Sequence, residues 1–138
     1  MIAVGAGGAV GSLARAGIAA GIPHEPGTWA WSTFIVNATG CFALAALLVC
    51  LPTHWSYARL LLGTGVLGGY TTFSALSIDA VTLLDRGRPA TAGAYVVLSV
   101  AVVLVAALAG RRAALVVTHR DGPRGTGTWC RRTGPGGS

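Results

Sequence analysis

The sequence predicts an all-α membrane protein with four transmembrane helices, and three observations support this fold class. The 138-residue chain is 53% hydrophobic and only 10% charged, far below the quarter or so of charged residues in soluble domains. Four almost uncharged runs fill residues 1–110, each near the roughly 20 residues that a helix needs to cross a hydrocarbon core. The runs lack the alternation of a β-barrel, and lipid offers backbone groups no partners, so each run is expected to be helical.

The first run, Met1–Ile22, contains Arg15 as its one charged residue. No basic segment precedes it and no small-residue cleavage site followed by polar sequence ends it, so we expect it to stay in the mature protein. Its glycines also resemble a dinucleotide-binding loop, but the chain has no room for a doubly wound sheet. Gly7 and Gly11, four residues apart, instead predict a smooth face on which another helix packs closely.

The other three runs are Thr33–Leu51, Leu60–Ile78 and Ala90–Gly110. Short connections join them and leave no space for an extramembrane domain. The connections carry tryptophans suited to the membrane interface, at positions 29, 31 and 55. An even number of spans puts both ends of the chain on one side of the membrane.

The third run has the strongest signal for a functional irregularity. Two adjacent glycines precede two threonines in Gly68–Thr72, and glycine costs a helix about 1 kcal/mol relative to alanine. We therefore predict a helix broken at Gly68-Gly69. A break at membrane depth is tolerated where something polar binds the freed backbone groups, which favours an ion site, although a simple packing kink is the alternative.

Residues 111–138 are predicted to form a separate, disordered tail, because they are rich in arginine and glycine. Six of the ten basic residues, all arginines, lie in this segment. Proteins that bind nucleic acid carry such charge as a patch on a soluble fold, so no nucleic-acid partner is expected. Membrane lipid headgroups are the expected contact of the tail.

Polar side chains inside the apolar runs are the candidate functional residues, since such groups usually face a bundle interior or a pore. Asn37 can donate two hydrogen bonds, although interhelical hydrogen bonding is its alternative role. Arg15 can attract an anion towards a vestibule or extend its charge to the interface. The further candidates are Thr39, Thr71, Thr72, Ser74, Asp79 and Ser99.

Three motifs resemble the Fluc (CrcB) family of fluoride-specific ion channels over residues 1–110. They are Gly7–Arg15 (GGAVGSLAR), Thr33–Gly40 (TFIVNATG) and Gly68–Asp79 (GGYTTFSALSID). Ala94–Ser99 of the fourth run adds a weaker match. The resemblance implies passive fluoride export across the plasma membrane, conferring fluoride resistance, by an antiparallel, dual-topology dimer with two pathways at its interface.

The same resemblance implies roles for particular residues. Backbone carbonyls of Gly68 and Thr71 from both subunits would hold a structural sodium ion that is not transported. Fluoride sheds its water only where several hydrogen-bond donors replace it, and the candidate donors are Asn37, Thr72, Ser74 and Ser99. Phe73 matches a position whose electropositive ring edge faces the anion.

Leu76 departs from the family pattern, because it replaces the second phenylalanine of the pathway. It supports one alternative, a non-conducting subunit or obligate heterodimer partner that pairs with a paralogue rather than with itself. A small multidrug exporter, a second alternative, needs a carboxylate in its first helix, but the one glutamate, Glu25, lies in a connection. No enzyme is expected, because the three histidines lack paired nucleophiles or metal ligands.

Overall fold

The computed structural model describes residues 2–120, which form four helical spans long and apolar enough to cross a membrane. The first two spans are α1 (Ile2–Gly21) and α2 (Trp31–Cys50), and the last is α6 (Pro89–Arg120). The third span, Ser56–Asp85, is composite and contains α3 (Ser56–Arg59), η1 (Leu60–Leu67), α4 (Gly68–Tyr70) and α5 (Phe73–Asp85). No strand occurs within residues 2–120, so the predicted all-α membrane class is confirmed.

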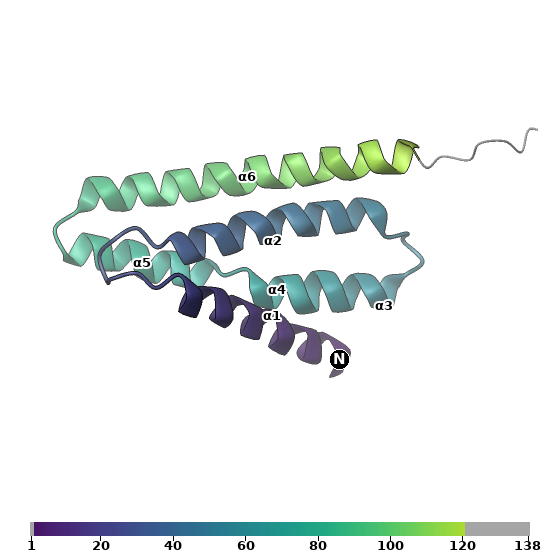
Figure 1. The fold of residues 1–138 in the computed structure, drawn as a ribbon, viewed down its shortest axis with the longest axis horizontal. Helices are drawn as coiled ribbons and strands as arrows, with labels where there is room; N and C mark the ends of the chain where they lie inside the picture. Colours follow the sequence, from purple (N-terminus) through teal and green to yellow (C-terminus); the bar gives the residue numbers. More distant parts are fainter. Residues whose placement is uncertain (1, 121–138) are drawn as a thin grey trace, which may run out of the picture.

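The four spans form a flat bundle with two packed pairs of helices (Figure 1). In one pair α2 runs along α6, and in the other α1 crosses η1 and α4. The start of α1 and the end of α6 lie at the same end of the bundle. The α1–α2 connection and the α5–α6 turn lie at the opposite end, which we call the turn end.

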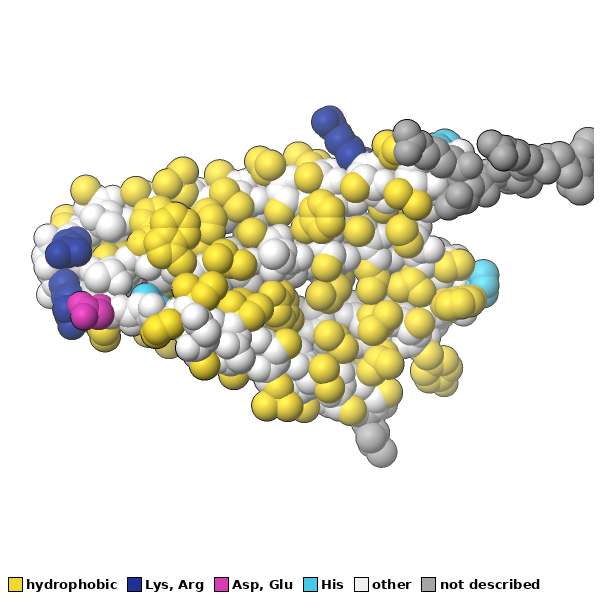
Figure 2. All heavy atoms as spheres, in the orientation of Figure 1, with side chains coloured by type: hydrophobic (Ala, Val, Ile, Leu, Met, Phe, Trp, Pro, Cys, Tyr) yellow, Lys and Arg dark blue, Asp and Glu magenta, His cyan; other side chains and the backbone are white. Residues whose placement is uncertain are grey.

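Apolar side chains cover the sides of the bundle, whereas charged ones gather near its ends (Figure 2). Its core is small, and consists of Ala30, Leu76, Leu83, Ala92 and Tyr95. Large aliphatic side chains of α6, such as Val97 and Leu104, are instead 67% and 59% exposed. Such a surface suits hydrocarbon rather than water as solvent.

Glycines let α1 approach the third span to backbone contact. A Cβ atom added to Gly11 would overlap the carbonyl oxygen of Val66, and one added to Gly69 would overlap that of Gly8. The predicted smooth face of the first helix is therefore present. It packs against η1 and α4 of the same chain.

The break in the third span lies at Thr71 and Thr72 rather than at Gly68-Gly69. Gly68–Tyr70 is still helical, whereas Thr71 (φ −75°, ψ 153°) and Thr72 (φ −149°, ψ 122°) are extended. The extended backbone suits β-branched threonine, and Thr72 caps the next helix by accepting a hydrogen bond from the Ala75 N–H. Gly69 serves close packing against Gly8 of α1, and the two threonines form the break.

A π-helix, η1, which was not predicted from the sequence, precedes the break. In it the N–H of Gly68 reaches back to the carbonyl oxygen of Gly63, five residues earlier. Long π-helical stretches are rare, and short ones concentrate at functional sites. The wider turn places buried Gly63 and Gly65 towards α2 and α1 respectively.

The last helix continues beyond Gly110, where the predicted tail begins. Residues 111–120 are helical, because they contain good helix formers such as Arg, Ala and Leu and no glycine or proline. The rest of the predicted tail, residues 121–138, lies outside the described residues. At 1.5 Å per residue, α6 is about 48 Å long, so it exceeds a hydrocarbon core of about 30 Å.

Candidate ion-pathway site

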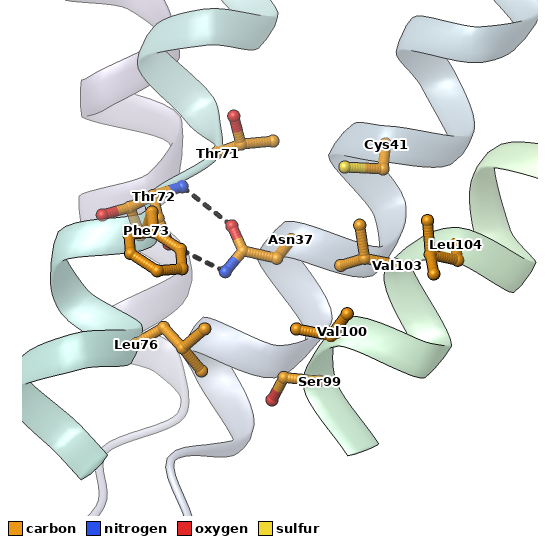
Figure 3. Close-up of a pocket in the computed structure, with 10 residues that line it drawn as sticks. All are labelled: Asn37, Cys41, Thr71, Thr72, Phe73, Leu76, Ser99, Val100, Val103 and Leu104. Carbon is orange, nitrogen blue, oxygen red and sulfur yellow. Dashed lines mark hydrogen bonds between the residues drawn. The ribbon is translucent and has the colours of Figure 1, made fainter. Parts of the chain in front are cut away.

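A cavity of about 260 Å³ lies beside the break in the third span, between α2, α5 and α6 (Figure 3). Four of the predicted pathway residues line it: Asn37, Thr72, Phe73 and Ser99. Three aliphatic side chains of α6 also line it: Val100, Val103 and Leu104. A few polar groups in an apolar cavity are the arrangement of a selective binding site. We call this the central cavity.

Asn37 of α2 stabilises the extended backbone at the break by two hydrogen bonds to Thr72. Its Nδ2 donates to the carbonyl oxygen of Thr72, and its Oδ1 accepts from the N–H of Thr72, each over 2.8 Å. Both backbone groups of Thr72 are thus satisfied without a helical partner, which an apolar environment requires. Asn37 is only 9% exposed, and its second N–H hydrogen is left for another acceptor.

Ser99 of α6 supplies a hydroxyl without a partner at the wall of the central cavity. The side chain is 4% exposed, and its Oγ makes no hydrogen bond among the described residues. A buried hydroxyl normally has a partner, because leaving it unpaired costs about 1–3 kcal/mol. The Ser99 side chain lines the central cavity, and its hydroxyl has a hydrogen-bond donor that no described residue uses.

Phe73 and Leu76, one turn of α5 apart, differ sharply in exposure. Phe73 is 76% exposed and Leu76 is 5% exposed, yet both line the central cavity. The Phe73 ring thus lies at the edge of the central cavity, and most of its surface has no contact with its own chain. Leu76 packs into the core cluster with Tyr95.

Arg15 and Ser74 lie around the same break but outside the central cavity. Arg15 lines a second cavity of about 200 Å³, together with Ser32, Thr33 and Thr72. The hydroxyl of Ser74 lies 3.1 Å from that of Thr72. Thr72 lines both cavities and so lies between the one that Arg15 borders and the central cavity.

The backbone at the break has carbonyl groups suited to a hard cation. In a continuous helix the N–H of Thr72 would bond to the carbonyl of Gly68, but here it donates to Asn37. The carbonyl of Gly68 thus loses this helical partner, and Thr71, whose carbonyl comes next to it at the break, is itself extended. Oxygen donors of this kind fit sodium at a broken helix.

Two polar residues that were not among the predicted site residues contact Asp79. Thr33 and Tyr95 both donate hydrogen bonds to its Oδ2. A periodicity signal was available, because Thr33 lies one turn before Asn37 and Tyr95 one turn before Ser99. Cys41, which also lines the central cavity, lies one turn after Asn37.

Comparison with known proteins places the chain in a family. Residues 2–111 match the sequence model described as CrcB-like protein, Camphor Resistance (CrcB). The chain is 44% identical over 110 residues to fluoride-specific ion channel FluC 1 of Mycolicibacterium paratuberculosis, an alignment that covers 77% of this chain and 83% of the relative. It is 40% identical over 114 residues to FluC of Rhizobium meliloti, covering 80% and 91%.

A further relative, FluC 2 of Nocardia farcinica, is 42% identical over 113 residues, covering 80% of this chain and 78% of the relative. These relatives are ion channels, not enzymes. The resemblance predicted from the three motifs is confirmed. Four membrane spans and at least 40% identity to bacterial channels show that this chain is a multi-pass plasma-membrane protein and belongs to the CrcB family.

Proposed function

We propose that this chain is a subunit of a fluoride-selective channel that lets fluoride leave the cell passively and so lowers cytoplasmic fluoride. One observation of the fold carries the proposal: Asn37, Thr72 and Ser99 line one cavity, and the buried hydroxyl of Ser99 has no hydrogen-bond partner among the described residues. The relatives named as fluoride-specific ion channels support fluoride as the transported ion.

Selectivity follows from how fluoride can be dehydrated. The ion is small and strongly hydrated, so it leaves water only where several donors converge. The candidate donors are the hydroxyls of Ser99, Thr72 and Ser74 and the spare amide hydrogen of Asn37. The electropositive edge of Phe73 adds a weaker contact, and the aliphatic wall of α6 gives larger, weakly hydrated anions no additional donors.

We further propose that two chains pack antiparallel and form two pathways at their interface. The 76% exposure of Phe73 supports this arrangement, because a ring that lines a pathway needs a cover that its own chain does not supply. Gly68 is also exposed, and an added Cβ there would meet only the carbonyl oxygen of Gly63, at 3.7 Å. The partner is a second copy or a paralogue.

The decisive experiment is fluoride efflux from proteoliposomes that contain this chain alone. We expect selective efflux of fluoride over chloride, and we expect Leu76→Phe to preserve or raise the rate, since Leu76 borders a cavity that has room for a ring. A chain that is silent alone but active as Leu76→Phe, or with a paralogue, is instead a heterodimer partner. Silence under all three conditions in a folded, dimeric preparation contradicts the channel proposal.

A structural sodium ion at the dimer centre is the second part of the proposal. When bound, it would offset the converging carbonyl dipoles of Gly68 and Thr71 from two subunits. We expect purification in N-methylglucamine instead of sodium to shift the dimer towards monomer in size-exclusion chromatography, or to stop fluoride efflux. Readdition of sodium is the control, and identical dimer content and efflux with and without sodium would leave the break as a packing feature.

A further inference from the structure

The charged residues of the bundle are unevenly divided between its two ends. Within residues 2–120 the acidic residues are Glu25 in the α1–α2 connection and Asp79 and Asp85 on α5. All three lie in the half of the bundle that finishes at the turn end, and Figure 2 shows acidic side chains there. Arg86 and Arg88 follow Asp85 in the α5–α6 turn. The basic residues of this turn thus have acidic residues close by.

The opposite end, where α1 starts and α6 finishes, has only basic charge. We call it the terminal end, and within residues 2–120 its charged residues are Arg59, Arg111, Arg112 and Arg120. Arg59 donates from Nη1 to the carbonyl oxygen of Leu51 over 3.4 Å. Arg111 and Arg112 are exposed, and the one ion pair among the described side chains lies towards the turn end. The described residues therefore leave the charge of Arg111 and Arg112 without a counter-charge.

The position of these two arginines along α6 is that of the membrane boundary. The break lies at the middle of the third span, Ser56–Asp85, so the central cavity beside it marks the mid-depth of the bundle. Ser99 and Leu104 of α6 line this cavity. At 1.5 Å per residue, Arg111 lies about 18 Å beyond Ser99 and about 10 Å beyond Leu104. Half of a hydrocarbon core is about 15 Å, so Arg111 and Arg112 lie where hydrocarbon meets the lipid phosphates.

The neighbours of Arg112 on α6 indicate that lipid surrounds this position. Leu108 lies one turn before Arg112 and Val116 one turn after it. Their side chains are 58% and 54% exposed, and exposed aliphatic groups of this kind suit hydrocarbon. A soluble anion would have to bind between apolar side chains. A phospholipid instead presents a phosphate and acyl chains together.

We propose that Arg111 and Arg112 form a binding site for the phosphate of an anionic phospholipid. A guanidinium group donates two parallel hydrogen bonds to phosphate oxygens, and an arginine side chain reaches the headgroups while its stem stays in apolar surroundings. Each basic residue near an anionic membrane surface contributes about fivefold in affinity. The pair is therefore expected to select an anionic over a zwitterionic phospholipid by about 25-fold.

A lipid bound at this site would also act on the packing of α2 with α6. Gly110, directly before the two arginines, lies so close to α2 that an added Cβ would overlap the carbonyl oxygen of Phe42. The same two helices contribute Asn37 and Ser99 to the central cavity. A lipid that fixes the depth of α6 thus stabilises this helix pair, and we expect it to raise the unfolding temperature of the protein.

The test is lipid binding to the full chain in detergent micelles that contain either phosphatidylglycerol or phosphatidylcholine. Native mass spectrometry measures the lipid bound, and thermal unfolding of the same samples measures stabilisation. For wild type we expect phosphatidylglycerol to bind about 25-fold more tightly and to raise the unfolding temperature by several degrees. The double variant Arg111→Gln and Arg112→Gln is expected to lose most of this preference. Each single variant, expected to lose about fivefold, keeps the test decisive if the double variant does not fold.

The matched control is the double variant Arg86→Gln and Arg88→Gln, which removes the same charge from the turn end and is expected to keep the wild-type preference. Inorganic phosphate at the same concentration is expected not to stabilise the wild-type chain. Size-exclusion chromatography checks that every variant is folded.

Three results would each overturn the lipid site. They are an unchanged preference after both Arg111 and Arg112 are replaced, an equal loss in the turn-end control, and equal stabilisation by inorganic phosphate. None of these measurements involves fluoride transport, so they leave the channel proposal untouched.

Discussion

Replacement of Asn37 by aspartate is expected to lower fluoride efflux at least a hundredfold. Aspartate keeps the volume and still accepts from the N–H of Thr72, but its second oxygen opposes the Thr72 carbonyl that Asn37 now holds at 2.8 Å. The lost hydrogen bond accounts for about 1 kcal/mol. A fixed charge about 4 Å from fluoride adds about 4 kcal/mol of repulsion at an effective dielectric constant of about 20, so the charge dominates.

Efflux from proteoliposomes measures this effect, and size-exclusion chromatography checks that the variant is folded and dimeric. Asn37→Leu separates the two causes, because it removes the hydrogen bonds without adding charge. Thr118→Val is a control for the loss of a polar group in a helix, since within residues 2–120 Thr118 donates hydrogen bonds only to carbonyl groups of α6 itself. A folded Asn37→Asp variant that conducts at the wild-type rate would show that fluoride does not pass Asn37.

The second large effect is expected from Gly11→Ala, a change of one methyl group. The added carbon would overlap the carbonyl oxygen of Val66 and lie 2.8 Å from the backbone nitrogen of Tyr70. Real Cβ atoms essentially never lie within 3.0 Å of another atom, and neither backbone group can rotate away. Ordinary overpacking costs about 1–3 kcal/mol, so a clash with backbone is expected to separate α1 from the third span.

The yield of monodisperse protein and its thermal unfolding in detergent measure this change, and we expect most of the folded protein to be lost. Gly17→Ala is the matched control on the same helix, because a Cβ at Gly17 meets nothing within 4 Å. Gly17→Ala is expected to retain the wild-type yield. Equal stability of the two variants would show that α1 does not need close backbone contact at Gly11.

Hydrophobicity and length were sufficient to predict the four spans, because in lipid a long apolar segment must satisfy its backbone hydrogen bonds internally, as a helix does. The motifs were likewise sufficient for the family, since they lie in three different spans. The position of the break was harder to predict. Glycine propensity pointed to Gly68-Gly69, but propensity describes an isolated helix, whereas Asn37 of another helix stabilises the break at Thr72.

The end of the last helix and the π-helix show two other limits of the sequence. Arginine content suggested a tail from position 111, although arginine is also a good helix former, and the helix continues to Arg120. The π-helical stretch Leu60–Leu67 has no composition that distinguishes it from an α-helix. Contacts between distant segments, such as His24 with Asp79, are not visible in local patterns at all.

The double hydrogen bond between Asn37 and Thr72 also implies an order of events during biogenesis. A newly inserted third span has no partner for the freed backbone groups at Thr72, so in lipid an unbroken helix is its better initial state. The amide of the second span must arrive beside it before the interruption becomes favourable. We therefore expect the irregular backbone to be a product of helix association, formed only in those molecules whose spans have already found one another.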